Sequence, residues 1–177
     1  MKKLFPFFLI AVILLSSCGS PFVTTVKGDD YKIGILKGWK RVTTGDAENY
    51  EVFISPEETG TSANVKIQSQ TDAKITWGRI DEVTTDYAQK AVDELGYTLI
   101  SDKYQFVPQA QREQRYELVF SAEYKGQAFT VIQHLYARNI KAVFVTGTYP
   151  ENDFILGDQV KEMMDSFLLA PKNGWDD

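Results

Sequence analysis

The chain has 177 residues, of which 44% are hydrophobic and 13% are aromatic. This composition is typical of a folded domain and excludes a disordered chain. Acidic side chains outnumber basic ones, 24 to 19, and the formal net charge is −5, so we expect no nucleic-acid partner, because phosphate binding needs a basic surface. The chain has one cysteine, which excludes a disulfide within one molecule.

The first residues have the layout of an export signal. Lys2 and Lys3 precede the apolar run LFPFFLIAVILL at residues 4–15. A basic start before a short apolar run is typical of a secretory signal peptide, and the run is shorter than the roughly 20 apolar residues that span a bilayer. We therefore expect residues 1–17 to be a signal peptide and the protein to be exported.

The single cysteine follows this apolar run directly, in the sequence Leu15-Ser16-Ser17-Cys18. This stretch resembles the lipobox of bacterial lipoprotein precursors, whose cysteine is acylated and becomes the N-terminus of the mature protein. The resemblance implies that Cys18 is the lipidation site and that acyl chains hold the protein on a membrane, at about 0.8 kcal/mol per buried CH₂. Gly19 is not aspartate, which favours the outer membrane in a two-membrane bacterium. The alternative is an ordinary signal peptide cut nearby, with Cys18 lost or left as a free thiol.

The rest of the chain divides into three parts. We expect residues 18–28 to be the lipidated N-terminus and a short tether, residues 29–170 to form one domain, and residues 171–177 to be a polar tail. A chain of this length suits a single domain with its own core.

The first part of the domain has the period of β-strands. Apolar and polar residues alternate over residues 31–37 and 63–70, and a short run, EVFIS, occupies residues 51–55 before Pro56. Alternation with period two predicts strands with one buried face. We expect three strands here.

The period then changes to that of a helix. The apolar residues at helical spacing are Val83, Tyr87, Ala88, Ala91, Val92 and Leu95. Thr84 or Thr85 is suited to cap the start of this helix and Gly96 to end it. We therefore predict a helix of about ten residues.

Four more strands and a closing helix follow. The strand candidates are residues 97–106, 114–124, 128–137 and 142–149, with a hairpin turn at Lys125-Gly126. The closing helix carries the stripe Leu156, Val160, Met163, Met164 and Phe167. This order predicts an α+β fold in which an antiparallel sheet of about six to seven strands has helices on both faces, a three-layer α-β-α sandwich.

Short motifs in the same order resemble the PsbP/Mog-type fold, and within it the DcrB-like bacterial lipoproteins. The residues that carry the resemblance are Tyr31, Gly38-Trp39, Phe53-Ile54-Ser55-Pro56, Ala63-Asn64-Val65, Tyr116, Gly126, Gln133 and Ser166-Phe167. The resemblance implies a three-layer body with no shared catalytic site, in a group composed mostly of binding or assembly factors.

No catalytic or metal-binding motif stands out. His134 is the only histidine, with no nucleophile or carboxylate partner nearby in the sequence, so we expect it to be hydrogen-bonded within the sheet or to face solvent. The acidic clusters at residues 29–30, 46–48 and 176–177 lack the spacing of a calcium loop. We interpret them as solvated surface, and we predict no metal, no cofactor and no catalytic residue.

The three tryptophans and two methionines are the remaining candidates for a site. Trp39 follows a strand and is expected in the core, as are Met163 and Met164 in the helix stripe. Trp77 lies in the link QTDAKITWGRIDE and is the one candidate ligand-binding residue, because function is found disproportionately on such loops. The alternative for Trp77 is packing against the sheet.

The leading hypothesis is a non-enzymatic module of the bacterial cell envelope, anchored to a membrane by its N-terminal lipid, which binds a protein partner or helps to assemble a complex. The second hypothesis is a small-ligand or metal carrier at the membrane, with a pocket near Trp77 or the acidic loops. An enzyme with dispersed carboxylates is the third.

Overall fold

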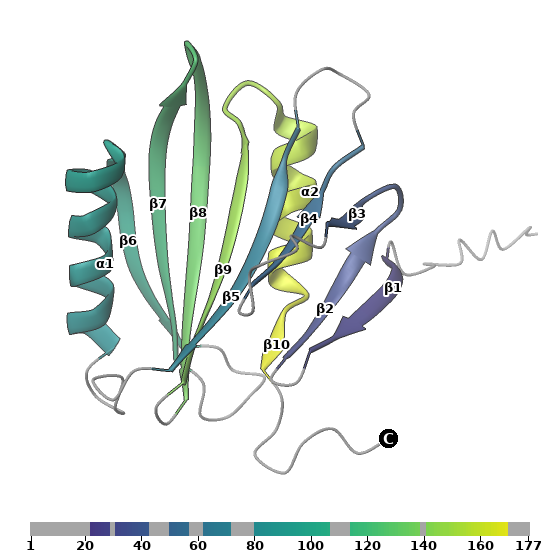
Figure 1. Ribbon diagram of the computed structural model, residues 1–177, viewed down its shortest axis with the longest axis horizontal. Helices are drawn as coiled ribbons and strands as arrows, with labels where there is room; N and C mark the ends of the chain where they lie inside the picture. The colour runs from purple at the N-terminus through teal and green to yellow at the C-terminus, as the bar shows by residue number, and fades with distance from the viewer. Residues whose placement is uncertain are drawn as a thin grey trace, which may run out of the picture.

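Two helices and two β-sheets make up the part of the chain that the computed structural model describes, which is residues 22–28, 31–42, 50–56, 62–71, 80–106, 114–138 and 141–169 (Figure 1). The large sheet has seven strands in the order β3-β4-β5-β9-β8-β7-β6, and each neighbouring pair is antiparallel. The small sheet has the order β1-β2-β10.

The elements follow the chain in a simple order. The strands of the large sheet are β3 (Lys40–Val42), β4 (Tyr50–Ile54), β5 (Asn64–Thr71), β6 (Thr98–Phe106), β7 (Gln114–Tyr124), β8 (Gln127–Arg138) and β9 (Lys141–Pro150). The small sheet contains β1 (Phe22–Lys27), β2 (Tyr31–Leu36) and β10 (Leu168–Leu169). The helices are α1 (Ile80–Leu95) and α2 (Phe154–Asp165).

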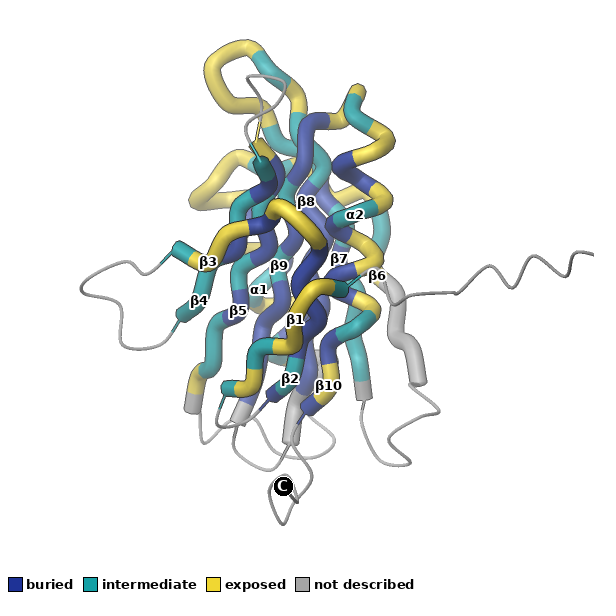
Figure 2. The backbone as a smooth tube through the Cα atoms, turned by 90° about the vertical axis from the view of Figure 1, so that its right-hand side faces the viewer, coloured by how far each residue is buried: buried dark blue, intermediate teal, exposed yellow. Residues whose placement is uncertain are grey.

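The large sheet is covered on both faces. Helix α1 contacts β6 and β7 on one face, and α2 contacts β9 and β5 on the other, where it also contacts β2 of the small sheet (Figure 1). Because side chains alternate along a strand, each strand supplies both layers. On β9, Val143 and Val145 belong to the core beneath α2, and Phe144 belongs to a cluster with Val83 and Tyr87 of α1. Figure 2 shows buried backbone positions in the interior, including along β8 and β9, and exposed positions at outer turns.

Helix α2 is held close to the sheet at a glycine. Asp153 caps the helix by accepting a hydrogen bond from the Leu156 amide at 3.0 Å. On the sheet, a side chain at Gly147 would overlap Val160. Glycine therefore lets the helix approach the backbone of β9.

The predicted fold class is confirmed, with differences in detail. The large sheet has seven strands, as expected, but the strand at residues 31–36 belongs to the small sheet, and its place in the count is taken by the three-residue strand β3. The predicted hairpin is also confirmed, because Lys125 and Gly126 have φ angles of 53° and 77° between paired strands.

Two boundaries are wrong. Helix α1 begins at Ile80 and has 16 residues rather than about ten, so neither Thr84 nor Thr85 is its cap. Both lie inside the helix, and Thr84 is 2% exposed. Residues 22–27, which we assigned to the tether, form strand β1 and pair with β2. The folded domain therefore begins at Phe22 rather than at residue 29, and the expected signal peptide and polar tail lie outside the described residues.

Candidate functional site

The two residues predicted as sites, Cys18 and Trp77, lie outside the described residues, and so do the three acidic clusters. Their roles stay predictions. Two other interpretations are confirmed. Trp39 is 7% exposed, and its indole nitrogen donates to Gln159 Oε1 at 3.0 Å, while Met163 and Met164 are fully buried.

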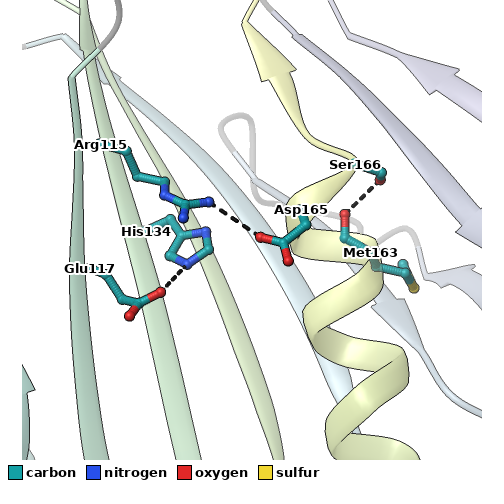
Figure 3. A network of polar contacts seen from close by, with 6 residues as sticks. All are labelled: Arg115, Glu117, His134, Met163, Asp165 and Ser166. Atoms are coloured by element: carbon teal, nitrogen blue, oxygen red, sulfur yellow. Dashed lines mark hydrogen bonds and ion pairs between the residues drawn. The ribbon is translucent and has the colours of Figure 1, made fainter. Parts of the chain in front are cut away.

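The lone histidine has a carboxylate partner that the sequence analysis missed. His134 on β8 and Glu117 on β7 are register partners, and the distance from His134 Nε2 to Glu117 Oε2 is 2.9 Å (Figure 3). A carboxylate only accepts hydrogen bonds, so Nε2 carries the hydrogen. The pairing could have been found from the turn at Lys125-Gly126, because a hairpin turn fixes which residues of its two strands face each other.

A second polar pair joins the sheet to the end of α2. Arg115 and Tyr136 are register partners on β7 and β8, and Arg115 Nη1 lies 3.3 Å from Asp165 Oδ1 (Figure 3). Burial raises the pKa of Tyr136 to about 12, although the neighbouring Arg115 charge and hydrogen bond act in the opposite direction. The Asp165 side chain is 67% exposed, so the ion pair itself contributes at most about 1 kcal/mol.

This cluster (Arg115, Glu117, His134, Tyr136 and Asp165) has the chemistry of a structural contact. His134 is 3% exposed, so a substrate has no access to its ring. Its Nδ1 atom is buried without a hydrogen-bond partner among the described residues, and no nucleophile is oriented by the pair. In the same part of the chain, no three His, Cys, Asp or Glu side chains are grouped to hold a metal ion.

The two most exposed large apolar side chains among the described residues lie at the start of α2. Phe154 and Ile155 are 80% and 73% exposed. They follow Glu151 and Asp153, and the helix they begin carries three acidic residues against one lysine. Isolated exposed apolar residues are common on proteins, but two adjacent ones at a helix start form a small apolar projection, with Glu151 and Asp153 just before it in the chain.

None of the known protein-family models matches this chain, and no curated protein matches it. Solved structures do. Cyanobacterial PsbP (CyanoP) from Synechocystis superposes with a TM-score of 0.64 at 14% identity, over 88% of this chain and 98% of the other. LpqN of Mycobacterium tuberculosis, a protein involved in cell envelope biogenesis, gives 0.54 at 14% identity, over 84% of this chain and 90% of LpqN.

A longer protein also contains this fold. A structure from Bacteroides thetaiotaomicron matches 81% of this chain with a TM-score of 0.53 and 11% identity, and the chain spans 46% of that protein's length. At these identities the likeness shows the fold alone. The chain has a PsbP-like fold.

Neither α1 nor α2, the two helices in the described residues, is long and apolar enough to cross a membrane.

Proposed function

We propose that this protein is an exported, lipid-anchored, non-enzymatic binding module of the bacterial cell envelope, in the DcrB-like group of the PsbP-like fold. The observation that carries the proposal is the spacing between the lipobox cysteine and the folded domain. Residues 19–21 alone separate Cys18 from β1, which begins at Phe22. At about 3.5 Å per extended residue, Phe22 lies within roughly 14 Å of the lipidated cysteine, so the lipid would hold the domain directly against the membrane surface.

The fold comparison supports this location without assigning a role. LpqN, which has the same fold, is involved in cell envelope biogenesis. Because a fold is shared by proteins with unrelated functions, this agreement is weaker support than the lipobox itself.

The anchor is tested by mass spectrometry of the mature N-terminus. We expect protein purified from membranes to begin at Cys18 and to carry acyl chains on it. Cys18→Ala should abolish acylation and leave the protein as a precursor or a soluble species, whereas Ser20→Ala, which lies outside the lipobox, should be processed normally. A mature protein with an unmodified thiol, or lipid attachment that survives Cys18→Ala, would reject the anchor.

The proposed binding surface is the apolar pair Phe154 and Ile155. Glu151 and Asp153 precede the pair in the chain and Asp158 follows it on α2, so the partner that fits it is a protein with an apolar pocket and basic residues at its rim. Exposed apolar side chains stabilise a complex most when they enter such a pocket.

This surface is tested by crosslinking in intact cells followed by purification. We expect one partner to be recovered with the wild-type protein and lost with the double variant Phe154→Ser, Ile155→Ser. Leu95→Ser is the matched control, since Leu95 is also exposed, at 63%, but lies on α1. Recovery that is equal in all three proteins would exclude this surface.

A further inference from the structure

A small cavity lies between α1 and strands β6 and β7. Its volume is about 160 Å³, and its wall includes five residues of α1, two of β6 and two of β7. Two of the helix residues that face the sheet here, Thr84 and Ala88, have small side chains and are 2% and 9% exposed. The space exists because neither side chain is large enough to fill it.

A β-bulge shapes the strand side of this cavity. Leu99 pairs with Phe120 and Ser101 pairs with Val119, so Ile100 is the extra residue. Leu99 and Asp102 both line the cavity, although residues three apart in a regular strand point to opposite faces. The bulge shifts the alternation by one position and turns Asp102 toward the helix.

The apolar part of the cavity is open to solvent on one side. Val92 of α1 and Leu99 of β6 line it and are 37% and 40% exposed, whereas Leu118 of β7 is 2% exposed. The cavity therefore has an apolar floor and an accessible apolar rim, which suits a small ligand that stays partly in water.

The polar part of the wall includes the Asp102 carboxylate and the Gln89 side chain, beside the hydroxyl groups of Thr84, Thr85 and Tyr116. The Asp102 carboxylate lines the cavity and forms no ion pair with another side chain in the described ranges. The Gln89 amide nitrogen already donates to both oxygens of Asp93, at 2.9 Å each, so its carbonyl oxygen is the group left for a ligand. Among the described residues, no lysine, arginine or histidine lines the cavity, so no cationic side chain there would pair with an anion.

We propose that this cavity binds a small primary amine in its ammonium form. The ammonium group would donate hydrogen bonds to Asp102 and to the carbonyl oxygen of Gln89, and the apolar body would lie against Val92, Leu99 and Leu118. Cavities of about 150 Å³ hold a benzene-sized molecule, so the apolar body is a single ring or a chain of about six carbons. This site is independent of the lipid anchor and of the Phe154 surface.

The experiment is an NMR titration of the mature lipoprotein in detergent micelles, with benzylamine as the probe. We expect saturable shift changes confined to the amides of residues 84–92, 99–102 and 116–118. Benzyl alcohol, which has the same shape without the charge, should bind about tenfold more weakly, because a hydrogen bond to a charged group contributes more than a neutral one. Benzoate should not bind.

Three variants separate this site from nonspecific binding. Asp102→Asn should weaken benzylamine binding about tenfold and leave benzyl alcohol binding unchanged, and Asp158→Asn, an exposed position on α2, should change neither. Ala88→Leu should fill the cavity and abolish both; if it does not fold, Asp102→Asn still decides. Equal binding of the amine and the alcohol, full affinity in Asp102→Asn, or shift changes elsewhere would overturn the proposal.

Discussion

The two faces of the large sheet are packed in different ways. Beneath α2, the core side chains Val145, Val160, Met163 and Met164 are all fully buried. Beneath α1, the helix contributes small residues such as Thr84 and Ala88, and the cavity remains beside them. Dense packing stabilises a fold and a cavity destabilises it. We therefore expect packing on the α2 face to contribute most of the free energy of unfolding. The α1 face has a cavity, lined by described residues, with room for a ligand.

The largest expected effect tests the α2 face. Phe53 of β4 is fully buried in the core beneath α2, so Phe53→Ala should reduce the free energy of unfolding by about 3–5 kcal/mol, through lost burial and a new cavity. Phe154→Ala, at an 80% exposed position, should change it by less than about 0.5 kcal/mol. Chemical denaturation measures both. Similar losses for the two variants would contradict the assignment of Phe53 to a stabilising core beneath α2.

A smaller effect comes from the polar cluster at the edge of the same face. Burial raises the pKa of Tyr136 to about 12, whereas a tyrosine in the unfolded chain has a pKa of about 10. Between these two values the unfolded state loses the proton and the folded state keeps it, so stability falls as pH rises from about 10 to 12. The loss should be about 2–3 kcal/mol, since one pKa unit corresponds to about 1.4 kcal/mol.

Tyr136→Phe isolates this contribution. The variant has no phenol to ionise, so its unfolding free energy should fall less than that of the wild type over the same pH range. Denaturation at pH 9.5, 11 and 12 makes the comparison. Tyr124, which is 64% exposed, provides the control, because Tyr124→Phe should keep the wild-type pH dependence. Parallel pH curves for wild type and Tyr136→Phe would show that Tyr136 does not cause the loss.

The sequence predicted the parts of the fold that repeat regularly. Alternation identified the strands around Val65 and Val145, helical spacing identified α2, and Lys125-Gly126 identified the hairpin. Strand β1 was missed because most of its residues are exposed on both sides, which leaves no alternation of burial to detect. The alternation of apolar and polar residues also does not show which sheet a strand joins, because strands of both sheets have a period of two residues. For this reason β2 was placed in the wrong sheet.

The candidate sites were predictable to different degrees. The Glu117–His134 contact follows from the hairpin register and could have been derived. The cavity could not have been derived, because it depends on the bulge at Ile100. A one-residue bulge moves Asp102 to the other face of the sheet, and the residue types around it do not reveal that shift. A strictly alternating strand predicts Asp102 on the opposite face of the sheet from Leu99.

The smallest expected effect compares one valine from each helix. Val160 of α2 is fully buried, and Val92 of α1 is 37% exposed at the rim of the cavity. Val92→Ser should therefore reduce the free energy of unfolding by less than about 1 kcal/mol. Val160→Ser should reduce it by about 2–4 kcal/mol, because it removes buried apolar surface and places a hydroxyl in an apolar interior. Denaturant titration of the two variants at neutral pH measures both losses of unfolding free energy directly.

Because Val92→Ser also removes apolar contact from the cavity, it should weaken binding of benzylamine and benzyl alcohol alike. A loss in Val92→Ser as large as in Val160→Ser would mean that the α1 face is packed as tightly as the α2 face, and the contrast between a stabilising face and a binding face would then fail.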